Sequence, residues 1–141
     1  MSKLTEMLRR HEGVETHAYK CTSGKITVGV GRNIDPSGGL GLSDDEIEFM
    51  LENDVARCAK ELGNQFPWFS GLDEVRRDAM IDLCFNMGIT SLRNFKMANA
   101  AMAEDNWDEA ADQYLDSKYA RDVGRRAVEI AEMIRTGEYQ N

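Results

Sequence analysis

Long apolar runs are missing from this 141-residue chain, and none approaches the length that a membrane-spanning helix needs. The first six residues contain no apolar signal core, so we expect no export signal. Basic residues are also few, because 17 Lys and Arg stand against 25 Asp and Glu and give a net charge of -8. That charge argues against nucleic acid as a partner and against stable association with anionic membranes.

Cysteine and histidine are scarce as well. The three cysteines, Cys21, Cys58 and Cys84, are an odd number with wide spacing, so we expect free thiols. Cys58 and Cys84 fall in helical patterns and read as small buried apolar groups, whereas Cys21 lies beside a turn. Because His11 and His17 have no third donor at metal-ligand spacing, we predict no metal site and no cofactor.

The remaining composition is typical of one globular domain. Hydrophobic residues make up 42% and charged residues 30%, and a chain of this length can bury a core without staples. Repeats, linkers and low-complexity tracts are absent. Apolar residues recur at helical spacing over residues 2–12, 43–62, 72–87, 94–103, 107–117 and 124–135. We therefore predict the α+β class, mainly α.

Capping residues mark where two of these helices begin and end. Ser2 or Thr5 suits the start of the first helix. Ser43 and Glu46 form a capping box at the start of the long helix that follows, and Gly63 is expected to end it.

The stretch from Glu12 to Gly31 is the most informative part of the sequence. The first helix ends at Glu12, a turn at 22–25 closes a hairpin, and residues 26–31 alternate as its second strand. Gly29 and Gly31 leave one face of that strand without bulk, so another molecule can approach the backbone there.

Three groups that can handle a proton or a water, Glu12, Cys21 and Thr27, are expected to converge on one small cleft. Glu12 lies at the negative end of a helix dipole, which disfavours the carboxylate and suits a general acid. The alternatives are a solvated glutamate at a helix end and an ordinary strand threonine.

The spacing of these three residues resembles the catalytic signature of the phage-type lysozymes, glycoside hydrolase family 24. That signature is a glutamate, eight residues, an aspartate or cysteine, five residues and a threonine. The resemblance covers nearly the whole chain, through the segments 7–10, 29–31, 75–88, 91–95, 107–111 and 135–139.

The resemblance implies a lysozyme-like fold, similar to the T-even phage lysozymes with a shortened β-lobe. Residues 13–42 would form a small β-hairpin lobe, optionally with a short third strand, and 43–62 a connecting helix. Residues 63–141 together with 1–12 would form the helical lobe, and active-site residues would lie in the groove between lobes.

The resemblance also implies an activity, the cleavage of the β-1,4 bond between N-acetylmuramic acid and N-acetylglucosamine in peptidoglycan. Glu12 would be the general acid and Thr27 would hold the attacking water. Cys21, in place of the commoner aspartate, would be a thiolate near a cation such as Lys20, a neutral thiol that positions water, or a nucleophile. We favour positioning or base catalysis with inversion.

Supporting residues come from the same resemblance. Arg126 matches an arginine beside the catalytic glutamate, and Asn86 and Tyr119 match positions near the cleft that touch the glycan. Gly29 and Gly31 match the glycines beside the threonine. A surface cation, a helix-surface amide and a packed tyrosine are the alternatives for the first three.

The biological setting implied is that of a monomeric endolysin whose partner is bacterial peptidoglycan. It would accumulate in the host cytoplasm and reach the wall after holin-type permeabilisation of the membrane. Two other functions stay open: a lytic transglycosylase, which forms an anhydro product, and a non-catalytic glycan-binding or structural virion protein.

Overall fold

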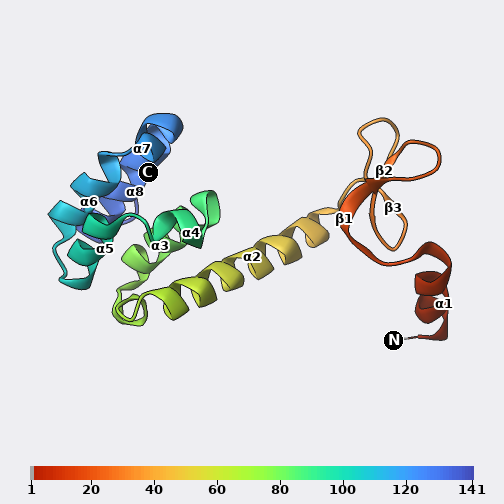
Figure 1. The fold of residues 1–141 in the computed structure, drawn as a ribbon, viewed down its shortest axis with the longest axis horizontal. Coiled ribbons are helices and arrows are strands. Elements are labelled where there is room, and N and C mark those ends of the chain that lie inside the picture. Colours follow the sequence, from red (N-terminus) through yellow and green to blue (C-terminus); the bar gives the residue numbers. More distant parts are fainter. Residues whose placement is uncertain (1) are drawn as a thin grey trace. The chain divides into compact units, whose positions relative to one another are not determined.

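The computed structural model describes residues 2–141, which divide into two compact units. Unit 1 extends to Met50 and unit 2 covers Leu51–Asn141. The described residues are mainly helical, and one small antiparallel sheet lies in unit 1, which confirms the predicted fold class (Figure 1). Within residues 2–141, no helix combines the length and the apolar character needed to cross a membrane.

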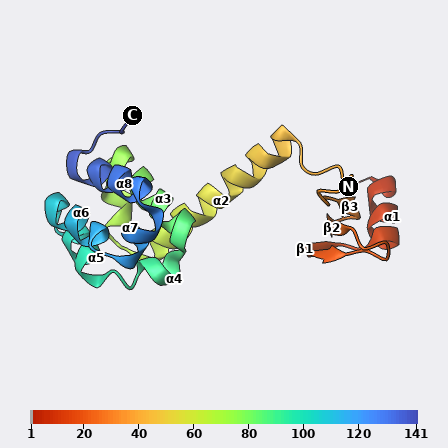
Figure 2. The same ribbon diagram turned by 90° about the horizontal axis from the view of Figure 1, so that it is seen from above.

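Unit 1 contains helix α1 (Lys3–Glu12), strands β1 (Glu15–Lys20), β2 (Ile26–Gly29) and β3 (Arg32–Asn33), and the start of helix α2 (Asp44–Gln65). The strands are antiparallel in the order β1-β2-β3, labelled in Figure 2. The optional third strand is thus present. The second strand is shorter than the alternation predicts, because the chain turns at residues 30–31 before pairing again.

Local hydrogen bonds explain where the helices of unit 1 begin and end. The Ser2 hydroxyl accepts from Thr5 N at 3.1 Å, which satisfies one of the free N–H groups at the start of α1. Gly13 ends that helix with φ 78°. At the start of α2, Glu46 Oε1 accepts from Ser43 N at 2.9 Å, the reciprocal half of the predicted capping box.

The predicted end of α2 at Gly63 is wrong. The helix continues to Gln65, and Phe66 N donates to Leu62 O at 2.8 Å. Leu62 is fully buried and Phe66 is 7% exposed, so the additional turn keeps both apolar side chains on one buried face. Burial of these two residues outweighs the cost of about 1 kcal/mol for a glycine inside a helix.

Unit 2 contains the rest of α2 and a bundle of shorter helices. Their bounds are η1 (Phe69–Gly71), α3 (Glu74–Met87), α4 (Ile89–Leu92), α5 (Lys96–Ala103), α6 (Trp107–Leu115), α7 (Lys118–Val123) and α8 (Arg125–Thr136). Helices η1, α4 and α7 were not predicted, since three, four and six residues are too short to show a helical period. The other helices agree with the predicted ranges to within two residues at most ends.

The hydrophobic core of unit 2 is built from these helices. Its largest fully buried side chains are Leu62, Met80, Leu83, Leu92, Met102 and Ile134. Cys58 and Cys84 are each 3% exposed and belong to the same core, as their helical positions predicted. All three cysteines are free.

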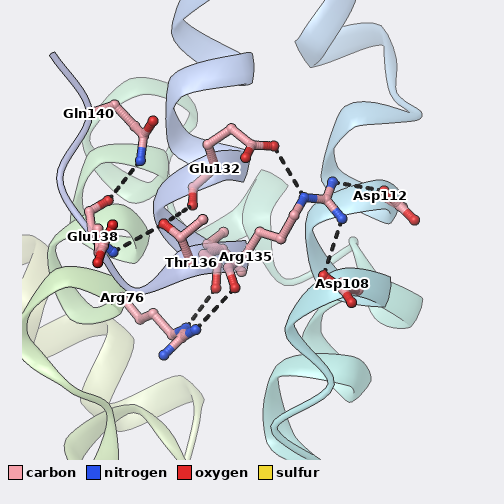
Figure 3. Close-up of polar contacts among 9 residues, drawn as sticks. Arg76, Asp108, Asp112, Glu132, Arg135, Thr136, Glu138 and Gln140 are labelled. Atoms are coloured by element: carbon pink, nitrogen blue, oxygen red, sulfur yellow. Dashed lines mark hydrogen bonds and ion pairs between the residues drawn. The ribbon is translucent and has the colours of Figure 1, made fainter.

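Helix α8 is fixed to α6 by the guanidinium of Arg135 (Figure 3). It pairs with Asp112 at 2.9 Å and Asp108 at 3.4 Å on α6, and with Glu132 at 3.1 Å on its own helix. Arg76 of α3 donates to the carbonyl oxygens of Ile134 at 2.6 Å and Arg135 at 3.3 Å. Two arginines therefore hold the helix that carries Arg126.

The predicted lobe boundaries, with residues 1–12 joined to 63–141, stay a prediction.

Candidate active site

The carboxylate of Glu12 lies against the backbone of Gly31. Glu12 is the last residue of α1, and Gly31 lies in the turn between β2 and β3 with φ 65°. A Cβ atom built on Gly31 would be 2.6 Å from Glu12 Oε2 and 3.0 Å from Glu12 Cδ. The absence of a side chain at Gly31 therefore makes room for the carboxylate of Glu12. The sequence predicted room for a second molecule, and it did not indicate which group would fill it.

The Cys21 thiol lies in the turn between β1 and β2. Its Sγ is 3.1 Å from Ser23 Oγ, while Cys21 N donates to Lys25 O at 2.9 Å and Gly24 N donates to Cys21 O at 2.8 Å. The Ser23 hydroxyl, followed by main-chain hydrogen bonds at Lys25 and Ser23, lowers the pKa of the Cys21 thiol to about 7.

Hydrogen bonds, and not the cation at Lys20, are therefore the cause of the lowered pKa of Cys21. Sequence reasoning missed Ser23. The available signal was a hydroxyl two residues after the cysteine, within the same tight turn.

Thr27 lies in the middle strand of the sheet and is only 4% exposed. Its hydroxyl donates to Lys25 O at 3.0 Å. A hydroxyl has one proton to donate, so Thr27 Oγ1 offers its remaining lone pairs only as acceptors. Thr27 was expected to hold a water by donating or accepting a hydrogen bond, and in this structure its hydroxyl can only accept one from that water.

Unit 2 brings Arg126 and Tyr119 together around an acidic residue that sequence reasoning missed. Arg126 Nε donates to Asp82 Oδ1 at 2.9 Å. The Tyr119 hydroxyl is buried and has no hydrogen-bond partner within residues 2–141, and burial together with Asp82 raises its pKa. Asn86 is exposed one helical turn after Asp82, on the same face of α3.

A groove of about 370 Å³ adjoins this cluster in unit 2. Four of its lining residues are apolar and three are charged: Leu51, Val55, Ile81, Phe85, Asp78, Asp82 and Arg126.

The candidate residues thus form two groups. Unit 1 contains Glu12 with Gly31, and Cys21 with Thr27 on consecutive segments of the hairpin. Unit 2 contains Arg126 with Tyr119, and Asn86 on the neighbouring helix α3. In the part of the chain that the structure describes, no cluster of three or more His, Cys, Asp or Glu side chains could hold a metal ion.

Comparisons with a family model and with individual proteins agree on one family. Residues 9–132 match the family described as phage lysozyme. "Probable T4-type lysozyme 1" from Dictyostelium discoideum is 24% identical over 163 aligned positions, which cover 97% of this chain and 96% of that protein. The "Endolysin" of Acyrthosiphon pisum secondary endosymbiont phage 1 is 25% identical, covering 85% of this chain and 80% of that protein.

A third relative is a much longer protein. The "Pre-baseplate central spike protein Gp5" of Enterobacteria phage T4 is 23% identical over 98% of this chain, and the match covers 28% of its own length. The residues matched by the family model, 9–132, include all the candidate residues of both units.

Proposed function

The chain belongs to the phage lysozyme family, and from this we propose that it cleaves the β-1,4 bond between N-acetylmuramic acid and N-acetylglucosamine. Family membership makes it a lysozyme-type hydrolase of peptidoglycan. The observation that carries the finer proposal is the placement of Glu12 beside Gly31, on the same small unit as Cys21 and Thr27.

Glu12 acts in this proposal as the general acid. Glycosidic cleavage needs a proton on the leaving oxygen, and a carboxylic acid can supply it. The Glu12 side chain is exposed, so a bound glycan can reach it. The close backbone of Gly31 limits where its carboxyl group can lie, which favours one direction of proton transfer.

Cys21 and Thr27 act on the attacking water. The Thr27 hydroxyl donates its own proton to Lys25 O, so its oxygen can accept a hydrogen bond from the attacking water. With a pKa of about 7, the Cys21 thiol is partly ionised at neutral pH, and the thiolate can accept the second proton of that water. A water held by two acceptors presents its own lone pair outward, as attack on the anomeric carbon with inversion requires.

The remaining residues support the glycan in this proposal. Arg126 would be a cation that assists the reaction, held in place by Asp82. Asn86 and Tyr119 would contact the sugar through an amide and an aromatic face. The backbone at Gly29, where an added Cβ would meet no atom within 4 Å, would let the sugar approach, whereas Gly31 makes room for the Glu12 carboxylate.

The biological role that we propose is that of an endolysin, a monomer that reaches the wall after holin-type permeabilisation. The endolysin relative supports this role. A second candidate is a lysozyme built into the virion, which the match to the T4 central spike protein favours.

The test of the reaction is mass spectrometry of the fragments released from purified peptidoglycan. Reducing N-acetylmuramic acid ends would support the proposal. Anhydro ends would identify a lytic transglycosylase and remove the water-holding role of Thr27. If no fragments appear, the chain is a non-catalytic glycan-binding or virion protein.

The roles are tested by comparing Glu12→Gln with Cys21→Ala. We expect Glu12→Gln to lower kcat by about 100-fold or more, since it removes the acid, and Cys21→Ala to cost much less. Glu15→Gln, an exposed glutamate three residues away, is the matched control and should keep its activity. Equal losses in the first two variants would contradict this ranking.

A further inference from the structure

The turn between β1 and β2 holds the sulfur of Cys21 beside the hydroxyl of Ser23. Two main-chain bonds close the turn, from Cys21 N to Lys25 O at 2.9 Å and from Gly24 N to Cys21 O at 2.8 Å. Gly24 adopts φ 81°, a left-handed conformation that glycine reaches without strain. The closed turn brings Ser23 Oγ to 3.1 Å from Cys21 Sγ. The main-chain hydrogen bonds on either side of Ser23 therefore fix the turn that keeps its hydroxyl close to the sulfur.

The direction of these hydrogen bonds favours an ionised sulfur. The main-chain N–H groups of Ser23 and Lys25 also lower the pKa of the thiol, because an N–H group can only donate toward the sulfur. A Ser23 hydroxyl that donates adds a further bond, and a thiolate accepts all of them better than a neutral thiol does. Thr27 lowers the pKa of the thiol less than Ser23 does, because its proton is directed to Lys25 O at 3.0 Å.

Charged neighbours of the turn are mostly engaged elsewhere. Lys25 Nζ donates to Ser37 O at 3.0 Å, Asp35 Oδ1 accepts from Ile26 N at 3.1 Å, and Arg32 pairs with Glu46 at 2.7 Å. The titratable and charged side chains on the adjoining segments are Glu15, His17, Tyr19 and Lys20 on β1, Lys25 before β2, and Arg32 and Asp35 on and after β3. The hydrogen bonds of the turn are thus the main influence on the sulfur.

We propose that Ser23 is a positioning residue, whose hydroxyl donates to Cys21 Sγ and holds the sulfur as an anion facing the attacking water. The inference rests on the proposed function, in which Cys21 acts on that water. It adds a reason why cysteine can stand where aspartate is the commoner residue: the turn supplies donors for an anion, and a thiolate or a carboxylate can use them.

The first experiment measures the ionisation of Cys21 directly. The native full-length chain is alkylated with iodoacetamide across a range of pH, and peptide mass spectrometry follows Cys21 alone. Removing one hydrogen bond to a charged group should raise the alkylation midpoint of Ser23→Ala by about one pH unit. Ser23→Thr keeps a hydroxyl and should restore most of the shift. Thr22→Ala, at the neighbouring exposed position of the same turn, should leave the midpoint unchanged.

The second experiment measures peptidoglycan cleavage across the same pH range. In Ser23→Ala, kcat should fall at pH 7 and recover as pH rises, with KM little changed, because the anion forms at higher pH. Thermal unfolding of each variant confirms that all compared chains are folded at the assay temperature.

The outcomes separate this inference from the proposed function. If the alkylation midpoint of Ser23→Ala does not move, or moves without the pH dependence of kcat following it, Ser23 does not position Cys21 for the reaction, and the activity that depends on Glu12 stands. A wild-type chain that releases no fragments overturns the proposed function. The alkylation midpoint alone then shows whether Ser23 donates a hydrogen bond to Cys21.

Discussion

Replacing Gly31 with alanine would place a methyl group against the carboxylate of Glu12. The added Cβ would lie 2.6 Å from Glu12 Oε2 and 3.2 Å from Glu12 Cγ. To restore an ordinary contact of 3.4 Å, the carboxylate oxygen must move by about 0.8 Å. The carboxylate is the far end of a flexible side chain, so we expect it to yield and the fold to persist.

The variant has two costs of different kinds. Alanine at φ 65° is strained by about 1–2 kcal/mol, which lowers the free energy of unfolding. The displaced carboxyl group affects the reaction instead, since a misplacement of about 1 Å can cost about 100-fold in rate. We therefore expect kcat/KM of Gly31→Ala to fall by about 10- to 100-fold while the chain stays folded.

Gly41→Ala is the matched control. Gly41 has φ 68° and belongs to the same unit, yet an added Cβ there would meet no atom within 4 Å. It should lose the same stability and keep its activity. The assay is the release of reducing ends from purified peptidoglycan, with urea unfolding of both variants. Wild-type activity in Gly31→Ala, or an equal loss in Gly41→Ala, would refute the reasoning.

Three further predictions concern stability and thiol chemistry. The ion pair with Arg32 lowers the pKa of Glu46 to about 2, below its unfolded value of about 4.3. The ionised Glu46 therefore adds to the free energy of unfolding in full above about pH 4.3, and this stabilisation is lost as pH falls through 2. Glu46→Gln should flatten the decline in unfolding free energy across that window, measured by urea denaturation at each pH. Met80 is fully buried, and Met80→Ala should lower the free energy of unfolding by about 2–5 kcal/mol, seen as a lower urea midpoint with an unchanged slope. An aromatic disulfide reagent should modify Cys21 in the native chain and the two core cysteines only after denaturation, because both are 3% exposed; three reactive native thiols would contradict the structure.

The local sequence determined the longer helices and several of their ends. Ser2 caps α1, Glu46 bonds back to Ser43, and Asn106 Oδ1 accepts from Glu109 N at 3.4 Å at the start of α6. Each of these contacts joins residues three apart, so a short window of sequence contains all the groups involved. The spacing from Glu12 to Thr27 is equally local, and it was sufficient to indicate the phage lysozyme family.

Tertiary structure decided which groups meet. Gly31 lies against Glu12, 19 positions away, and Arg126 pairs with Asp82, 44 positions away. The long α2 continues past Gly63 because the core buries Leu62 and Phe66 together, which local propensity opposes.

Cys21 shows where the two levels divide. The position of Cys21 in the sequence predicted that its thiol lies in the active site. The sequence alone did not determine whether that thiol is ionised, because an isolated thiol is mostly neutral at pH 7. The folded turn brings the Ser23 hydroxyl to 3.1 Å from the sulfur and lowers the pKa of the thiol to about 7. Sequence determined which residues were available for the chemistry, and the folded turn determined the charge of Cys21. Only the tertiary structure placed Gly31 against Glu12 and Asp82 against Arg126, since these contacts depend on distances that only the folded chain sets.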